Sequence, residues 1–269
     1  MIARHHLPAA PLRRGLLRLL CLLAALGISG CFAAVRADTR QVGPFLCRAD
    51  FSLGEIEGVL NELVQLQADL SRTLAIPGPR EPIDLYLFRD KAAYTRALDR
   101  YLPNLPYRKA LYVKGRGPGK VFAHRSRDFQ TDLRHECTHA LLHAALPMVP
   151  LWLDEGLAGY FEMEPEKRAS GNPHLDSIRW TLQWGTGPSL SVLEQQTDVA
   201  KMGRTQYRDS WAWVHFMLHG PEEAHQELVA FLADIRRATP PGLLSQRLAR
   251  RLPGLQQRFA QHFRGWNRR

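Results

Sequence analysis

The feature that most constrains the fold of this chain is a pair of histidines four residues apart, with a glutamate directly after the first. The segment reads His135-Glu136-Cys137-Thr138-His139. Residues at positions i and i+4 lie one above the other on the same face of an α-helix, so both imidazoles can bind one metal ion. Glu136 can then reach a water molecule at that ion. The segment therefore predicts a helix that carries two ligands of a metal site.

A second segment, one short turn further along the chain, offers a third ligand. Residues 151–162 read Leu-Trp-Leu-Asp-Glu-Gly-Leu-Ala-Gly-Tyr-Phe-Glu. A catalytic zinc site has three protein ligands and an open position for water. Glu155 is the natural third ligand, and Asp154 is the alternative. Because successive helical residues point about 100° apart, both carboxylates cannot face the metal equally. Asp154 could instead orient a ligand histidine.

Together the two segments resemble the gluzincin metallopeptidases, in which H-E-x-x-H is followed one helix later by a ligand Glu. The run from Trp152 to Glu162 is most similar to the aminopeptidase-like branch, and it also resembles a group of poorly characterised secreted bacterial peptidase-like proteins. The resemblance implies an α+β fold with a zincin or thermolysin-like catalytic domain. It also implies one Zn²⁺ per chain on His135, His139 and Glu155, and a peptide or protein substrate.

The chain departs from related patterns at three places. Metzincins need Gly at position 142 and His at position 145, where this chain has Leu142 and Ala145. Thermolysin-like enzymes usually carry an Asp four residues after the ligand Glu, where this chain has Gly159. The G-x-M-x-N segment, with which aminopeptidases bind the substrate amino terminus, is not found upstream. We therefore expect neither a metzincin nor a classical aminopeptidase.

The resemblance implies catalytic roles for Glu136 and Tyr207. Glu136 is expected to act as the general base, taking a proton from the metal-activated water and passing it to the leaving amine. The alternative is a surface carboxylate paired with an arginine such as Arg134. Tyr207, 52 residues after Glu155, is the candidate donor to the oxyanion, and the alternative is an ordinary half-buried tyrosine. His143 lies about 6 Å further along the helix axis than the second ligand, so packing or an orienting role is favoured over ligation.

Apolar periodicity predicts one domain, residues 38–269, with a small mixed sheet followed by a mostly helical half. Strands are predicted at 45–47, 83–88, 110–113 and 121–124, and helices at 53–74, 91–101, 129–145, 151–162, 178–184, 207–218, 222–237 and 243–266. The last two strands flank a glycine-rich connection and are expected to form a hairpin. From the resemblance, the strand around Val121–Ala123 is expected to be the edge strand that pairs with an extended peptide.

Residues 1–37 are predicted to be a signal peptide. An arginine-rich start precedes the apolar run 19–28, which is too short for a comfortable membrane span, and Val35-Arg36-Ala37 reads as a small-residue cleavage site. The segment 28–31 also resembles a bacterial lipobox, which would leave a lipid anchor on Cys31. We expect an exported protein, periplasmic or extracellular, or alternatively a lipoprotein anchored through Cys31. No transmembrane domain is expected in the mature chain.

Net charge and cysteine content bear on whether the protein binds nucleic acid and whether it contains a disulfide. Removing residues 1–37 leaves 31 basic and 26 acidic residues, so the net charge falls from +10 to +5. The basic clusters near the C-terminus are short and lack interleaved aromatic residues, so nucleic-acid binding is not expected. Cys47 and Cys137 form either a disulfide, which export permits, or two buried small side chains.

Three functions fit these observations. The first is a zinc-dependent metallopeptidase that hydrolyses peptide bonds with Glu136 as general base. The second is a non-catalytic peptidase-fold protein that binds partners or acts as a scaffold in the cell envelope. The third is a zinc hydrolase that acts on a non-peptide amide of the envelope. The intact set of three ligands and the glutamate between the histidines favour the first.

Overall fold

The computed structural model describes residues 38–103, 107–115, 117–185 and 187–266, whose elements are those of a mixed α+β protein, as predicted. The predicted signal peptide 1–37, its cleavage site and the lipobox with Cys31 lie outside the described residues. Within the described part, none of the helices combines the length and the apolar content that a membrane span needs.

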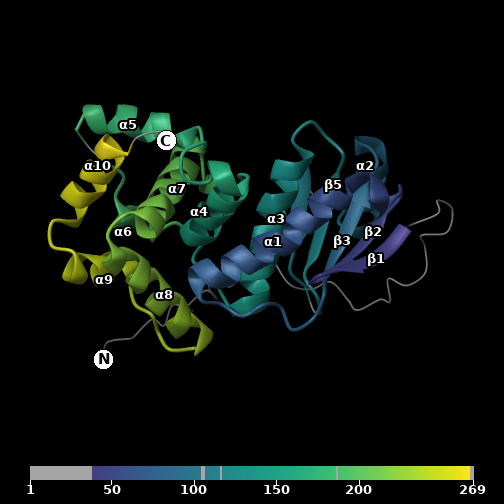
Figure 1. Ribbon diagram of the computed structural model, residues 1–269, viewed down its shortest axis with the longest axis horizontal. Coiled ribbons are helices and arrows are strands. Elements are labelled where there is room, and N and C mark those ends of the chain that lie inside the picture. The colour runs from purple at the N-terminus through teal and green to yellow at the C-terminus, as the bar shows by residue number, and fades with distance from the viewer. Residues whose placement is uncertain (1–37, 104–106, 116, 186, 267–269) are drawn as a thin grey trace, which may run out of the picture. The chain divides into compact units, whose positions relative to one another are not determined.

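The described strands form one five-stranded mixed sheet (Figure 1). They are β1 (Asp38–Val42), β2 (Phe45–Ala49), β3 (Ile83–Phe88), β4 (Ala110–Val113) and β5 (Lys120–His124), in the order β1-β2-β3-β5-β4. The three central strands run parallel, whereas β1 and β4 pair antiparallel at the two edges. The sequence does not predict β1, because only one residue of Asp-Thr-Arg-Gln-Val is apolar.

The order of the strands corrects the predicted edge strand. The hairpin of 110–113 with 120–124 is confirmed, but β5, which contains Val121–Ala123, is paired on both sides, with β3 and with β4. A strand with two neighbours has no free row of backbone N–H and C=O groups to offer to a peptide. Among the described strands, the edge on this side of the sheet is therefore β4.

The described helices follow the predicted ranges closely in the first half of the chain. They are α1 (Glu57–Leu74), α2 (Lys91–Tyr101), α3 (Phe129–Ala145), α4 (Leu151–Phe161), α5 (His174–Gln183), α6 (Leu190–Leu193), α7 (Arg204–His219), α8 (Glu222–Arg236), α9 (Leu244–Arg251) and α10 (Leu255–Gly265). The prediction of one helix over 243–266 is wrong. Pro253 and Gly254 separate α9 from α10, because proline cannot continue a helix and Gly254 adopts a φ of +74°.

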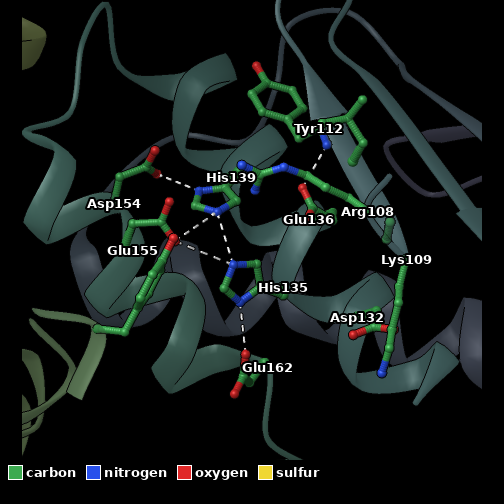
Figure 2. Close-up of a pocket in the computed structure, with 13 residues that line it drawn as sticks. Arg108, Lys109, Tyr112, Asp132, His135, Glu136, His139, Asp154, Glu155 and Glu162 are labelled. Atoms are coloured by element: carbon green, nitrogen blue, oxygen red, sulfur yellow. Dashed lines mark hydrogen bonds and ion pairs between the residues drawn. The ribbon is translucent and has the colours of Figure 1, made fainter. Parts of the chain in front are cut away.

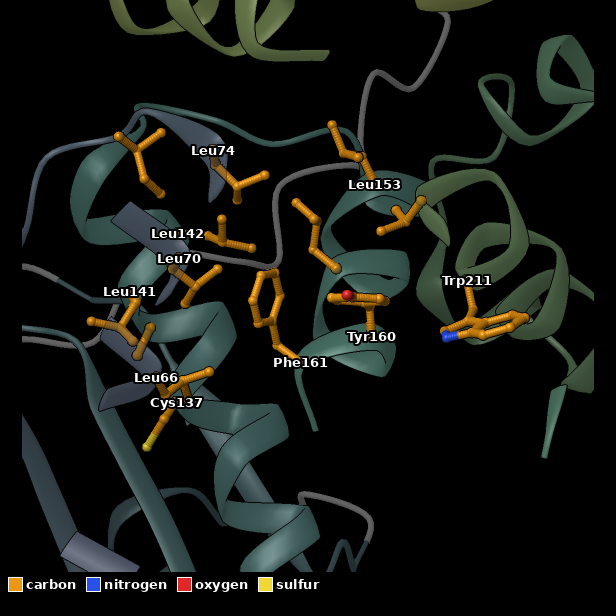
Figure 3. Close-up of a cluster of buried hydrophobic side chains, with 14 of the residues drawn as sticks. Leu66, Leu70, Leu74, Cys137, Leu141, Leu142, Leu153, Tyr160, Phe161 and Trp211 are labelled. Carbon is orange, nitrogen blue, oxygen red and sulfur yellow. The ribbon is translucent and has the colours of Figure 1, made fainter. Parts of the chain in front are cut away.

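Both faces of the sheet are covered, and successive strand residues point to opposite faces. The main core contains Leu85, Leu87, Val121 and Ala123 together with α1 and α3, and a second cluster contains Tyr86, Phe88 and Phe122 together with Tyr94 and Leu98 of α2. Figure 3 shows how the main core continues through Leu70 of α1, Leu141 of α3 and Phe161 of α4. The helix predicted to carry the metal ligands is thus packed against the sheet on one side and α4 on another.

Cys47 and Cys137 are both buried and both carry free thiols. Of the two alternatives, the structure therefore shows buried small side chains and no disulfide. Burial raises the pKa of the Cys47 thiol to about 11 and that of Cys137 well above its usual value. Neither thiol is a reactive thiolate near neutral pH.

Gly156 sets how closely α4 approaches α7. A Cβ at this position would lie 2.6 Å from the carbonyl oxygen of Ser210 and 2.9 Å from Cγ2 of Val214. Because the first obstacle is the backbone of α7, Gly156→Ala must push the two helices apart. We expect the free energy of unfolding to fall by about 1–3 kcal/mol, measured by urea unfolding. Gly159→Ala is the matched control, since a Cβ there meets no atom within 4 Å. Equal losses in both variants would contradict the packing account.

A histidine–aromatic cluster fills the contact of α7 with α10. It consists of Trp211, His215, His219, His262, Phe263 and Trp266. Nε2–H of His215 donates to the carbonyl of Ala169 at 2.8 Å, so Nδ1 of the neutral ring accepts from Nε2–H of His262 at 3.0 Å. Burial lowers the pKa of His215 to about 3 and that of His262 to about 4, and it also lowers the pKa of His219.

This cluster predicts a loss of stability in acid. An unfolded histidine has a pKa near 6.5, so between about pH 6.5 and pH 4 the unfolded chain binds protons that folded His215 and His262 do not. The two buried neutral histidines therefore make their full contribution to the free energy of unfolding above pH 6.5. Below that pH the free energy of unfolding falls, by at most about 1.4 kcal/mol per pH unit for each histidine. Urea unfolding at pH 7, 6 and 5 measures this slope. His262→Gln removes one titrating group and should flatten it, and an unchanged slope would contradict the assignment.

Candidate metal centre

The three predicted ligands meet where α3 packs against α4 (Figure 2). His135 and His139 project from α3, and Glu155 projects from α4. The two histidine Nε2 atoms are 3.2 Å apart, and Oε2 of Glu155 lies 3.6 Å from the first and 3.7 Å from the second. This His-His-Glu group could hold a metal ion.

The size of this triangle suits a tetrahedral ion. With bonds of about 2.1 Å, the ligand atoms of a tetrahedral zinc site are about 3.4 Å apart. The observed sides of 3.2, 3.6 and 3.7 Å differ from that value by only a few tenths of an ångström. The donor set of two imidazole nitrogens and one carboxylate oxygen is also one that zinc accepts. The residues present therefore fit the ion that the sequence predicts.

A carboxylate contacts the second ring nitrogen of each of the two predicted ligand histidines. Nδ1 of His135 lies 2.8 Å from Oε2 of Glu162, and Nδ1 of His139 lies 2.9 Å from Oδ1 of Asp154. A proton on each Nδ1 leaves the lone pair of each Nε2 directed at the metal position. The sequence pattern predicts that Asp154 can orient a ligand histidine, whereas it predicts no such role for Glu162. The signal for Glu162 is its place seven residues after Glu155, two helical turns along the same face.

The carboxylates also make the site favourable for positive charge. Burial lowers the pKa of His135, but Glu155 and Glu162 outweigh it and raise that pKa to about 10. Burial also lowers the pKa of His139, but the charge of Asp154 outweighs burial. The pKa of His139 is therefore raised. A metal ion held by the two Nε2 atoms would supply the positive charge that these carboxylates stabilise.

His143 contacts Asp154, the carboxylate that supports His139, in agreement with the prediction that it packs or orients and does not ligate the metal. Its Nε2 lies 2.9 Å from Oδ2 of Asp154. The ring of Tyr112 stacks against both His143 and His139, with centroid distances of 5.6 and 6.5 Å. Asp154 is thus fixed between two histidines, and one of these, His139, is a predicted ligand.

Glu136 faces the ligands and is held by the edge strand. The backbone N–H of Tyr112 in β4 donates to Oε2 of Glu136 at 2.6 Å. Arg134, the alternative partner considered for Glu136, is buried and bonds to Glu62 and to the carbonyl of Glu162 instead. Glu136 is therefore not a surface carboxylate paired with its neighbouring arginine.

A cavity of about 510 Å³ opens over the three ligands. Its walls are formed by Arg108, Lys109, Ala110, Leu111 and Tyr112 at β4, by Asp132 and Glu136 of α3, by Asp154, Glu162 and the ligands, and by Tyr207 of α7. Burial, followed by the charge of Glu155, raises the pKa of Tyr207, so its hydroxyl keeps its proton near neutral pH. All five residues predicted to form the site line this one cavity.

The carboxylates behind the histidines predict a measurable change in metal affinity. Asp154→Asn and Glu162→Gln each remove the negative charge that orients a ligand ring, and we expect each to weaken zinc binding about 10–100-fold. Titration against a chromogenic chelator measures this. Glu164→Gln is the control, because Glu164 pairs with Lys167 and does not line the cavity. Wild-type affinity in both site variants would show that these contacts do not support the ligands.

No protein-family model matches the chain, and no curated protein sequence gives a significant match.

Proposed function

We propose that this chain is a zinc-dependent metallopeptidase of the gluzincin type, built on a thermolysin-like catalytic domain. The observation that carries the proposal is the triangle of His135 Nε2, His139 Nε2 and Glu155 Oε2, with sides of 3.2–3.7 Å, beside Glu136 in one cavity. Two imidazoles and one carboxylate, with a carboxylate behind each imidazole, suit one zinc ion per chain.

Zinc bound here would act as a Lewis acid that polarises a substrate carbonyl and lowers the pKa of water. Glu136 would take the proton of the attacking water and deliver it to the amide nitrogen that leaves. Among the described residues, only one of its two oxygens, Oε2, has a protein donor. The other is left for the water, while the bond to Tyr112 N–H keeps the carboxylate at the cavity wall.

Tyr207 and β4 would complete the binding of the peptide. The protonated hydroxyl of Tyr207 can donate to the oxyanion that develops on the carbonyl. β4 takes the role that the sequence predicts for Val121–Ala123, because it is the edge strand on the side of the sheet where Glu136 lies. An extended peptide would pair with the outer backbone groups of β4 other than Tyr112 N–H, which donates to Glu136.

The proposal is tested with the zinc-loaded protein and a mixture of short peptides of varied sequence, with products identified by mass spectrometry. We expect new peptide ends with the wild type and none after removal of zinc by a chelator. A wild-type protein that contains one zinc per chain and yields no new ends would contradict the peptidase proposal. It would favour a non-catalytic protein of the cell envelope or an enzyme for another amide.

A further inference from the structure

Arg108 is the one charged group of the cavity wall that has no protein partner among the described residues. The other charged groups are occupied: Glu136 accepts from the backbone of β4, Glu155, Asp154 and Glu162 contact the ligand histidines, Lys109 pairs with Asp128, and Asp132 accepts from Ser126. An arginine that lines a cavity without a partner is available to a ligand.

The position of Arg108 directs it to the substrate. It precedes β4 by two residues, and Figure 2 shows its side chain extending from the side of β4 into the pocket, toward the side where His139 lies. Tyr207 lines the same cavity, and the charge of Arg108 opposes the rise in the pKa of its hydroxyl. Arg108 and Tyr207 therefore lie beside the same open space over the ligands.

We propose that Arg108 binds a carboxylate of the peptide substrate and makes the site selective for peptides that carry one near the cleaved bond. This inference rests on the proposed peptidase function. The planar guanidinium offers a fork of N–H donors that matches both oxygens of a carboxylate. A peptide paired with β4 advances about 3.3 Å per residue, so a carboxylate within about three residues of the scissile bond comes within reach of the Arg108 side chain.

Two sources can supply this carboxylate, and matched peptides separate them. One is an Asp or Glu side chain, and the other is the free carboxyl end of the peptide. The test uses the full zinc-loaded chain and four versions of one cleaved peptide, with Asp or Asn near the cleaved bond and with a free or an amidated C-terminus. A preference that follows Asp over Asn assigns the side chain, and one that is lost on amidation assigns the chain end.

We expect the wild type to prefer the carboxylate-bearing peptide about 10–100-fold in kcat/KM, mainly through a lower KM. Arg108→Gln should remove this preference, so that the carboxylate-bearing and the neutral peptide have equal kcat/KM, and Arg108→Lys should restore part of it. Arg127→Gln is the matched control, because Arg127 is exposed on the segment just before α3 and does not line the cavity. It should keep the wild-type preference.

Binding measured without turnover separates the failure of this inference from the failure of the proposed function. Calorimetry with Glu136→Gln should give tighter binding of the carboxylate-bearing peptide than of the neutral one. The double variant Glu136→Gln/Arg108→Gln should bind the two alike. A wild-type protein that cleaves all four peptides equally, or a preference that survives in Arg108→Gln, overturns the role of Arg108 and leaves the peptidase proposal intact. Absence of all cleavage contradicts the peptidase proposal, and equal binding of the peptides then overturns the inference as well.

Discussion

The Glu136→Gln variant should bind zinc as the wild type does and lose peptide hydrolysis by a factor of about 10²–10⁴. Glutamine has nearly the same shape, and its carbonyl oxygen can still accept from Tyr112 N–H, which donates to Glu136 at 2.6 Å. It cannot take the proton of the attacking water. The change should therefore appear in kcat, with zinc content and the midpoint of thermal unfolding close to those of the wild type.

The control for this variant is Glu57→Gln. Glu57 is an exposed carboxylate of α1 that pairs with Arg40, so its loss should leave turnover unchanged. If Glu136→Gln retained turnover within about tenfold of the wild type, Glu136 would not be the general base. The peptidase mechanism proposed for this site would then be wrong, even if the site holds zinc.

The Glu155→Ala variant is expected to lose stoichiometric zinc. His135 and His139 would remain, but two imidazoles do not complete the set of three protein ligands of such a site. Because zinc that binds only the folded protein stabilises it by about 2.7 kcal/mol at 100 times its dissociation constant, added zinc should raise the unfolding temperature of the wild type and not that of the variant. Elemental mass spectrometry of both proteins provides the independent count.

The control for this variant is Glu162→Gln, which weakens the support of His135 but keeps all three ligands. It should still take up zinc when the ion is in excess. If Glu155→Ala held one zinc per chain as tightly as the wild type, the third ligand would be a different group, and Asp154 would be the first to test because it neighbours Glu155 on α4.

The sequence predicts well that His135, His139 and Glu155 come together, because the signal is local. The i, i+4 spacing of His135 and His139 requires a helix, and α3 has the predicted bounds of Phe129–Ala145. The turn that follows is short, so α4 has little freedom except to pack back on α3, and this brings Glu155 to the histidines. The contact of Asp154 with Nδ1 of His139 follows from the same helical geometry, since successive helical residues point about 100° apart.

The sequence predicts less well the features that depend on contacts between segments far apart in the chain. Whether a strand lies at the edge is decided by its neighbours across the sheet, so the alternation within Lys120–His124 cannot show that β5 is covered by β4. Arg108 lies outside any helix or strand, and no periodicity marks it. The break between α9 and α10 is different, because the Pro253-Gly254 signal is local and outweighs the apolar period of 243–266.

The most direct test of the metal centre is anomalous diffraction at the zinc absorption edge from crystals of the purified protein. The account predicts one peak per chain, about 2.0–2.2 Å from Nε2 of His135, Nε2 of His139 and a carboxylate oxygen of Glu155. A protein that contains zinc with its peak elsewhere, or one that takes up no zinc at this position after reconstitution, would contradict it.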